Sequence, residues 1–204
     1  MKTRLTVTSI AVLAVAAAAL LTGTRSHAQS RPSAVAYKLD AAHCAVVFRI
    51  AHLGMSHTYG RFNDVSGKLM TDPAGHGSTS FEAVIKAASI DTNNKKRDDH
   101  LRSPDFFNVN QFPTITFKSG NVHAHGDVLH VTGELTLLGT TRPVEFHLRK
   151  MGEGKDPWGN QRIGFTTDPG RHMVIKRSDF GMTGHDKMVG NEVELMISFE
   201  GIRQ

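Results

Sequence analysis

The chain has 204 residues, of which 39% are hydrophobic, and this suits a single domain with a sizeable core. Its 24 lysine and arginine residues and 19 acidic residues give a formal net charge of +5. The single cysteine, Cys44, excludes an internal disulfide, so the core alone must hold the fold together. Because Cys44 lies in an apolar run, we interpret it as a buried small residue rather than a reactive thiol.

Residues 1–28 are typical of a cleaved secretory signal peptide. A basic start at Lys2 and Arg4 precedes an Ala/Leu/Val run over residues 10–21, and Ser26-His27-Ala28 offers small residues where a signal peptidase reads the chain. The run is too short and too rich in alanine for a membrane span, although a retained N-terminal anchor is the alternative. Cleavage after Ala28 leaves 176 residues with 21 basic and 19 acidic side chains. That near balance excludes the electrostatic footprint of a nucleic-acid-binding protein.

The remaining chain is dominated by apolar–polar alternation with a period of two, which indicates β-strands with one buried face. The alternating segments are residues 46–51, 81–88, 114–118, 144–149 and 192–199. Turn signals lie at residues 72–75, 119–121, 139–143 and 168–170. Since the pattern has no alternating long helices, it predicts antiparallel pairing. We therefore expect an all-β fold: an extended antiparallel β-barrel of about eight strands with one or two short helices.

The strongest helical segment is residues 95–103, with Asn93 or Asn94 available as the N-cap. The tripeptide Ser103-Pro104-Asp105 has the features of a second helix start, because a capping hydroxyl precedes a proline and an acid. A further short helical turn is expected at residues 177–181. We expect these small helices to lie across an end or a flank of the barrel.

The run Asp98-Asp99-His100 in this helical segment raises the question of a catalytic site. Adjacent helical residues point in diverging directions, so Asp99 is poorly placed to orient His100. The pairs that meet on a helix are Lys95 with Asp99 and Asp98 with Arg102, and both are opposite in sign. We interpret these charges as a solvated helix face. The chain also lacks the Gly-x-Ser-x-Gly elbow of serine hydrolases and the glycine loops that hold phosphate.

Metal binding is the main alternative chemistry, because residues 29–204 hold eleven histidines. On a strand, His123-Ala124-His125 would project both imidazoles from one face, a geometry that suits zinc or copper. No third ligand is fixed by spacing, so a solvent-exposed pair at a hairpin end is the favoured interpretation. His52 continues the apolar face of residues 46–50 and is either a hydrogen-bonded core residue or one polar group of a pocket.

The motifs of the chain resemble those of the YceI-like family. The matching segments, in order, are residues 37–43, 52–54 with 60–62, 97–107 followed by 112–117, 133–137 with 139–144, and 177–181. Residues 97–107, Arg-Asp-Asp-His-Leu-Arg-Ser-Pro-Asp-Phe-Phe, form the most characteristic run. The resemblance covers residues 36–202, which we expect to form one lipid-binding domain. It implies a lipocalin-like barrel in the bacterial periplasm that binds a polyisoprenoid or similar long-chain lipid in its lumen.

Given this resemblance, the leading hypothesis is a lipid-binding protein for transport, storage or sequestration, with no catalytic residues, no metal and no cofactor other than the lipid. The lumen candidates are Phe48, Ile50, Phe81, Ile85, Phe117, Phe146, Leu148, Leu195 and Ile197. Phe106 and Phe107 are expected to close one end of the barrel. The head-group candidates are His52, Arg61 and His100, which are polar residues beside apolar segments. For His100 we favour a structural role that fixes the helix to the barrel.

Two other classes stay open at this point. One is a histidine-dependent metal-binding protein or a small hydrolase that uses His52 and His100. The other is a scaffold whose cavity is incidental and which binds no lipid saturably. Homodimer formation is also left open by the sequence.

Overall fold

The computed structural model describes residues 34–71 and 79–204. The predicted signal peptide and the turn signal at residues 72–75 therefore lie outside the described residues. The strands are β1 (Val35–Leu39), β2 (Ala45–His52), β3 (Ser56–Phe62), β4 (Val65–Thr71), β5 (Ser80–Lys86), β6 (Ile90–Asp91), β7 (Thr114–His125), β8 (Val128–Leu137), β9 (Thr140–Lys155), β10 (Gln161–Thr167), β11 (Met173–Lys176) and β12 (Val189–Arg203). The helices are α1 (Lys95–Arg102) and the short 3₁₀ turns η1 (Ala41–His43), η2 (Ala87–Ser89) and η3 (Arg177–Phe180).

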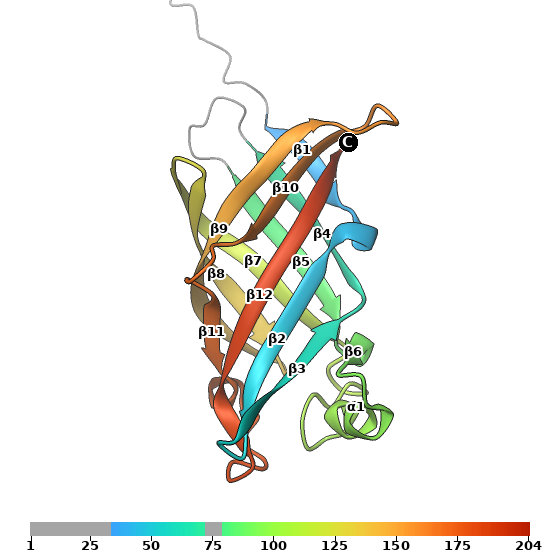
Figure 1. The fold of residues 1–204 in the computed structure, drawn as a ribbon, viewed down its shortest axis with the longest axis vertical. Coiled ribbons are helices and arrows are strands. Elements are labelled where there is room, and N and C mark those ends of the chain that lie inside the picture. The colour runs from blue at the N-terminus through green and yellow to red at the C-terminus, as the bar shows by residue number, and fades with distance from the viewer. Residues whose placement is uncertain (1–33, 72–78) are drawn as a thin grey trace, which may run out of the picture. The chain divides into compact units, whose positions relative to one another are not determined.

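Eight of these strands close into an antiparallel barrel (Figure 1). Their order around the ring is β1, β4, β5, β7, β8, β9, β10 and β12, and β12 pairs back with β1. Every pairing along this ring is antiparallel. Closure gives each strand of the ring a hydrogen-bonded neighbour on both sides. The predicted all-β barrel of about eight antiparallel strands is therefore confirmed.

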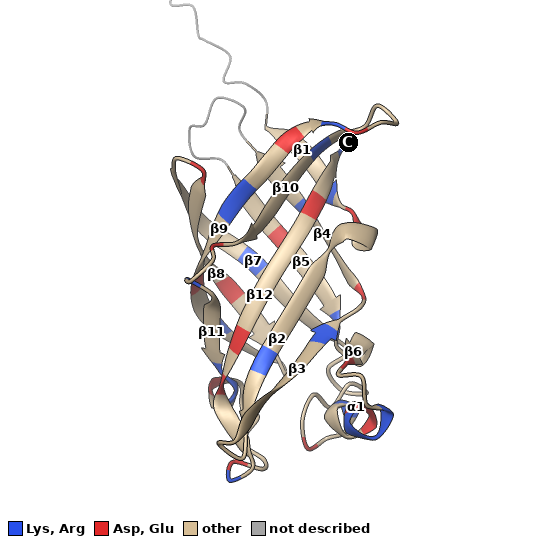
Figure 2. Ribbon diagram, in the orientation of Figure 1, with Lys and Arg blue, Asp and Glu red and all other residues tan. Residues whose placement is uncertain are grey.

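Strand β12 joins two parts of the wall because, with 15 residues, it is longer than each of the strands that pair with it. Toward its end it pairs with β10 and β1, and toward its start it pairs with β2 and β11. The wall then continues from β2 through β3 to β6, as Figure 1 shows. Figure 2 shows opposite charges on the adjoining strands β2 and β12, where Arg49 and Glu194 form an ion pair. The barrel is thereby extended along its axis beyond the eight-stranded ring.

The segment Ser119-Gly120-Asn121, which was expected to form a turn, lies inside the 12-residue strand β7. The β7–β8 pairing shifts register between Ser119 and Val122, as expected for a β-bulge. The Thr132 hydroxyl on β8 lies 3.2 Å from the Asn121 nitrogen and 3.3 Å from its carbonyl oxygen. The turn prediction is therefore wrong, because a bulge with side-chain hydrogen bonds uses the same residue types while the strand continues.

Helix α1 begins where the sequence predicts, with Asn94 as its N-cap. The Asn94 side chain accepts a hydrogen bond of 3.0 Å from the backbone nitrogen of Arg97. The expected pair of Lys95 with Asp99 is present at 2.6 Å. Among the described residues, no helix is long and apolar enough to cross a membrane.

The predicted pairing of Asp98 with Arg102 is wrong. Asp98 is only 7% exposed and accepts hydrogen bonds from the backbone nitrogen and the hydroxyl of Thr92. Arg102 instead contacts Asp99 and donates to the carbonyls of Ala88 and Ile90. Since both side chains bond to the segment around β6, they fasten α1 to the barrel rather than form a solvated helix face.

The second helix predicted at Ser103-Pro104-Asp105 is also absent from the described chain, where turns follow α1 directly. The backbone nitrogen of Phe107 donates to the carbonyl of Leu101 at 2.9 Å, which satisfies an acceptor at the end of α1. The chain thus folds back over the helix end and carries Phe106 and Phe107 toward the barrel. The helical turn expected at residues 177–181 is confirmed as η3, and Gly181 follows it with a φ of 83°.

Candidate ligand-binding cavity

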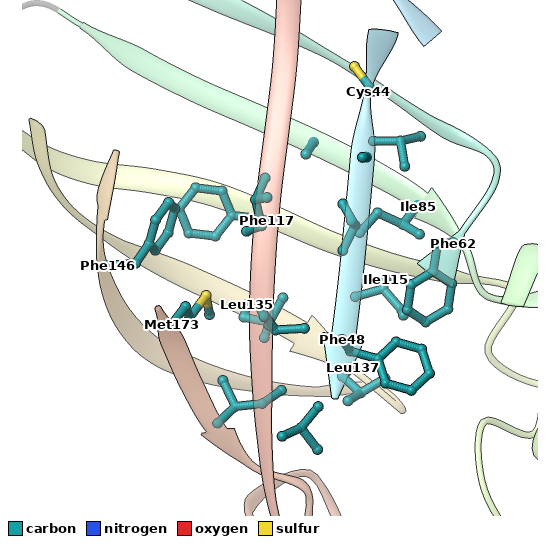
Figure 3. Close-up of a pocket in the computed structure, with 18 of the residues that line it drawn as sticks. Cys44, Phe48, Phe62, Ile85, Ile115, Phe117, Leu135, Leu137, Phe146 and Met173 are labelled. Atoms are coloured by element: carbon teal, nitrogen blue, oxygen red, sulfur yellow. The ribbon is translucent and has the colours of Figure 1, made fainter. Parts of the chain in front are cut away.

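An apolar cavity of about 190 Å³ lies inside the barrel. Figure 3 shows lining side chains drawn from several strands, and those that it labels carry only carbon and sulfur. Eleven of the residues predicted to bind lipid line this cavity. They are Phe48, Ile50, Phe81, Ile85, Phe106, Phe107, Phe117, Phe146, Leu148, Leu195 and Ile197. The structure therefore places the expected lumen residues together, with Phe106 and Phe107 supplied by the turn after α1.

The register of the strands explains how these side chains converge. On β12 and β2, Leu195 is opposite Phe48, and on β7 and β8, Phe117 is opposite Leu135. Because side chains alternate between the two faces of a strand, these opposed pairs place apolar groups on the same inner face.

Two glycines make room for aromatic rings in the wall. A Cβ at Gly60 would lie 2.4 Å from the ring of Phe48, and a Cβ at Gly133 would lie 2.7 Å from the ring of Phe117. Each distance is too short for a side chain, so glycine is required where these two rings cross a neighbouring strand.

The end of the cavity near α1 is built from aromatic side chains that contact one another. The ring centroids of Phe48 and Phe62 are 5.9 Å apart, and those of Phe62 and Phe107 are 5.6 Å apart in an edge-to-face arrangement. These contacts extend from strands β2 and β3 to the turn after α1. Aromatic pairs at such separations are attractive beyond their buried area, so this turn is fastened to the wall by the cavity residues themselves.

Cys44, at the edge of the same cavity, is buried. Burial raises the pKa of its thiol to about 11, so the group is neutral at physiological pH. The interpretation of Cys44 as a buried small residue is therefore confirmed.

Arg177 is a charged residue of the lining that was not among the predicted binding residues. It is only 3% exposed and donates hydrogen bonds to the carbonyls of Met182, Gly184, Val189 and Gly190, at 2.7–3.1 Å. Burial lowers the pKa of its guanidinium below the ordinary value, but arginine stays charged. Within the described residues its hydrogen-bond partners are all backbone carbonyls. A buried positive charge thus lies at the wall of an otherwise apolar cavity.

A second hollow, of about 630 Å³, lies near β1 and the β7–β8 hairpin. It is lined partly by polar side chains, among them Tyr37, His123, Lys150 and Glu153. The Tyr37 hydroxyl donates to Glu153 at 3.1 Å, and Lys150 pairs with Glu153 at 2.8 Å. This hollow differs in chemistry from the apolar cavity.

Three phenylalanines lie between the two hollows. Phe81 and Phe199 line the apolar cavity, whereas Phe165 lines the polar hollow. Their ring centroids are 5.5–5.8 Å apart in all three pairs. We refer to Phe81, Phe165 and Phe199 as the aromatic partition.

The three head-group candidates do not line the apolar cavity. His52 is exposed at the end of β2, and Arg61 is an exposed residue of β3 between Gly60 and Phe62. Strand alternation places Arg61 on the outer face, because its neighbour Phe62 lines the cavity. Their choice assumed that a polar residue next to an apolar segment faces the lumen. Arg61 instead lies on the outer face of β3, and His52 lies at the exposed end of β2.

His100 does not line the cavity either, but its ring contacts Phe106, which does. Its Nε2 atom lies 2.9 Å from Oδ2 of Asp105, and its ring meets Phe106 edge-on with centroids 5.0 Å apart. The hydrogen bond from His100 lowers the pKa of Asp105 below its ordinary value. His100 thus contacts the turn that carries Phe106, whereas the role favoured from sequence was to fix the helix to the barrel.

The histidine pair His123 and His125 is exposed on β7 beside the hairpin turn, as predicted. Within the described residues, the groups of side chains close enough to share a metal ion include His100 but not His52. The alternative site built on His52 together with His100 is therefore not assembled.

Comparison with known proteins places these features in a family. The YceI-like domain matches residues 37–201. A UPF0312 protein of Pseudomonas paraeruginosa is 42% identical over 189 residues, which is 92% of this chain and 97% of the relative. Among solved structures, BcnA of Burkholderia cenocepacia is 26% identical with a TM-score of 0.68, covering 79% of this chain and 98% of that one.

A further structural neighbour is described as a polyisoprenoid-binding domain from Saccharophagus degradans implicated in plant cell wall breakdown. It is 17% identical with a TM-score of 0.66, and covers 83% of this chain and 99% of that one, so this likeness concerns the fold. The match to the family extends over nearly all of the described residues and agrees with the closed barrel. The chain belongs to the YceI-like family.

Proposed function

We propose that this protein binds the tail of a long-chain amphiphile, such as a polyisoprenoid, in the apolar cavity of its barrel and carries or sequesters it in the periplasm. The observation that carries the proposal is the lining: among the described residues, Arg177 and Ser198 are its only charged or hydroxyl side chains. Apolar walls with few polar groups are typical of sites for apolar ligands. The Saccharophagus degradans domain, which has the same fold, supports the ligand class.

The size of the cavity favours a slender tail. Its 190 Å³ is below the range of roughly 300–1,000 Å³ that is common for compact small-molecule ligands. A linear chain of methyl and methylene groups suits such a narrow space better than a fused-ring molecule. Each buried CH₂ group would contribute about 0.8 kcal/mol, so every further carbon of the tail that enters the cavity would strengthen binding.

The head group of the amphiphile would lie toward Arg177. A guanidinium has five N–H donors, and the four observed hydrogen bonds leave one for a ligand. Its charge has no carboxylate among its hydrogen-bond partners in the described chain, so an anionic or strongly polar head is favoured. Toward the opposite end, the aromatic partition would limit the length of the tail.

Periplasmic location is supported by the sequence of residues 1–28, which is typical of a secretory signal. Amino-terminal sequencing of the protein recovered from a periplasmic fraction tests this part of the proposal. We expect a mature chain that begins at Gln29. A retained Met1 on protein anchored in the membrane would contradict it.

Binding is tested by a matched pair of substitutions on β5. Ala83 lines the cavity, whereas the next residue, Val84, is 40% exposed on the other face. We expect Ala83→Phe to fill the cavity and to weaken binding of an isoprenoid alcohol at least about tenfold, a loss of about 1.4 kcal/mol. Val84→Phe should leave the affinity unchanged.

The readout is a fluorescence titration with a polyene-labelled isoprenoid, with circular dichroism to establish that both variants are folded. Saturable binding that is lost only in Ala83→Phe supports the proposal. Equal affinity of the two variants, or no saturable binding by the wild type, would favour a scaffold with an incidental cavity.

A further inference from the structure

Two imidazoles and a carboxylate meet outside the cavity lining. His100 belongs to α1, Asp105 to the turn after it, and His185 to the segment between η3 and β12. Oδ2 of Asp105 lies 2.9 Å from Nε2 of His100 and 3.9 Å from Nε2 of His185. One ligand atom from each of the three residues lies within 4.8 Å of the other two.

These separations fit a tetrahedral metal ion. Zinc binds imidazole nitrogen and carboxylate oxygen at about 2.0–2.2 Å, so its tetrahedral ligand atoms are roughly 3.3–3.5 Å apart. The two Asp105 distances bracket this value, and small side-chain rotations would equalise them. We propose that His100, Asp105 and His185 bind a divalent transition-metal ion such as Zn²⁺, with a fourth position available to water.

The three side chains are held in place by their neighbours. The His185 ring stacks on Phe106 with centroids 5.3 Å apart and an angle of 10° between planes, and the His100 ring meets Phe106 edge-on. A Cβ at Gly184 would lie 3.3 Å from the carbonyl oxygen of Asp105, so the two backbones are in close contact. His185 has a φ of 57°, an unusual backbone conformation for a residue with a side chain. Because the ligands converge before an ion binds, less ordering is required on binding.

A second group of similar residues shows that close ligand atoms alone do not make a metal site. Asp40, His43 and Glu200 also lie within 4.8 Å of one another. However, the Arg162 guanidinium contacts Asp40 at 2.7 Å and Glu200 at 2.9 Å. This positive charge neutralises the carboxylates and repels a cation, so the group around Arg162 serves as a control.

The proposed ion would join two segments that both contribute to the apolar cavity. Phe106 is adjacent to Asp105, and Met182 precedes His185 by three residues; both line the cavity. A bound ion would therefore stiffen this end of the barrel. The metal site itself does not depend on lipid binding.

The test is isothermal titration of the purified, tag-free wild-type protein with Zn²⁺ alone. We expect one saturable site per chain and a higher melting temperature with the metal. His100→Ala, His185→Ala and Asp105→Asn should each weaken binding at least about tenfold, since even the loss of a supporting residue has that effect. His43→Ala and the double variant His123→Ala/His125→Ala should retain the site.

Asp105→Asn keeps the size of the side chain, so it tests the proposal if a histidine variant fails to fold. Nuclear magnetic resonance of the imidazole nitrogens should show zinc-dependent shifts for His100 and His185. No saturable binding, or a site that survives all three ligand substitutions, would overturn the proposal. So would a site that disappears with His123 and His125.

Discussion

The two hollows of the barrel share several strands, among them β1, β7, β8 and β9, but differ in chemistry. The cavity near α1 is apolar, with Arg177 as its one charged lining residue in the described chain, whereas the hollow near β1 contains Tyr37, Lys150 and Glu153. The aromatic partition of Phe81, Phe165 and Phe199 separates them. The polar hollow is the larger, at about 630 Å³ against 190 Å³, so volume alone does not identify the site of an apolar ligand.

The chemistry of the lining, rather than the volume, distinguishes the two hollows as sites for an apolar ligand. Polar groups in a hollow retain water and reduce the gain from burying a hydrocarbon chain. An apolar tail should therefore favour the smaller cavity.

Arg177→Met should destabilise the apolar end most strongly. The substitution leaves four carbonyl acceptors without their donor. Met182 is buried, whereas Gly184 is exposed and Val189 and Gly190 are half-buried, so water can replace part of the lost hydrogen bonds. Since a buried unsatisfied group costs about 1–3 kcal/mol, we expect a total loss of about 2–4 kcal/mol. Urea unfolding followed by circular dichroism measures the free energy of unfolding. Lys176→Met, at the exposed neighbouring residue, is the control and should change it by no more than about 0.5 kcal/mol. Similar values for the two variants would show that Arg177 is dispensable for the fold.

Phe165→Leu should weaken the aromatic partition. Removing part of this buried ring is expected to cost about 1–2 kcal/mol of stability, less than the 3–5 kcal/mol typical of Phe→Ala. It should also let a longer tail reach the polar hollow. Affinities measured for isoprenoids of increasing length should reach a plateau in the wild type and continue to rise in the variant. The same plateau in both proteins would mean that the partition does not limit the tail.

Tyr37→Phe should test the polar hollow alone. It removes one partly buried hydrogen bond to Glu153, worth about 0.5–1.5 kcal/mol. We expect this small loss of stability in thermal unfolding and no change in isoprenoid affinity, because Tyr37 does not line the apolar cavity. A marked loss of affinity would place the ligand in the polar hollow.

Acid should weaken the polar hollow through Glu153. Its hydrogen bond from Lys150 lowers the pKa of the carboxyl below the ordinary 4.5. A lowered pKa stabilises the fold above pH 4.5, and this contribution is lost as the pH falls through the lowered value. Glu153→Gln should therefore differ from the wild type in melting temperature at pH 7 and converge with it in acid. A difference that persists unchanged in acid would exclude this ionisation as its cause.

Much of the fold and of the lining followed from residue alternation. In the segments at 46–51 and 192–199 the larger apolar side chains recur at every second residue, so the phase of Phe48 and Leu195 was readable, and both residues line the cavity. Alternation cannot state which face is inward, but a closed barrel with one apolar face per strand leaves a single arrangement. The N-cap Asn94 and the turn at residues 177–181 were readable because they depend on neighbours in sequence.

Features that depend on distant contacts could not be read from the chain. Asp98 is buried because Thr92 supplies its hydrogen bonds, and Arg177 is buried because the chain from Met182 to Gly190 wraps its guanidinium. His185 meets His100 only after the β11–β12 connection folds toward α1. A sequence signal existed for Arg177, which lies in the family-like segment 177–181, but charge alone suggested exposure.

Native mass spectrometry of the purified protein would show whether the apolar cavity holds the tail of an amphiphile. The account predicts one co-purifying amphiphile per chain, extractable into organic solvent, present in wild-type protein and in Val84→Phe but missing from Ala83→Phe. Protein that carries no amphiphile in any form, or an amphiphile retained equally by Ala83→Phe, would contradict the claim that the apolar cavity holds the tail.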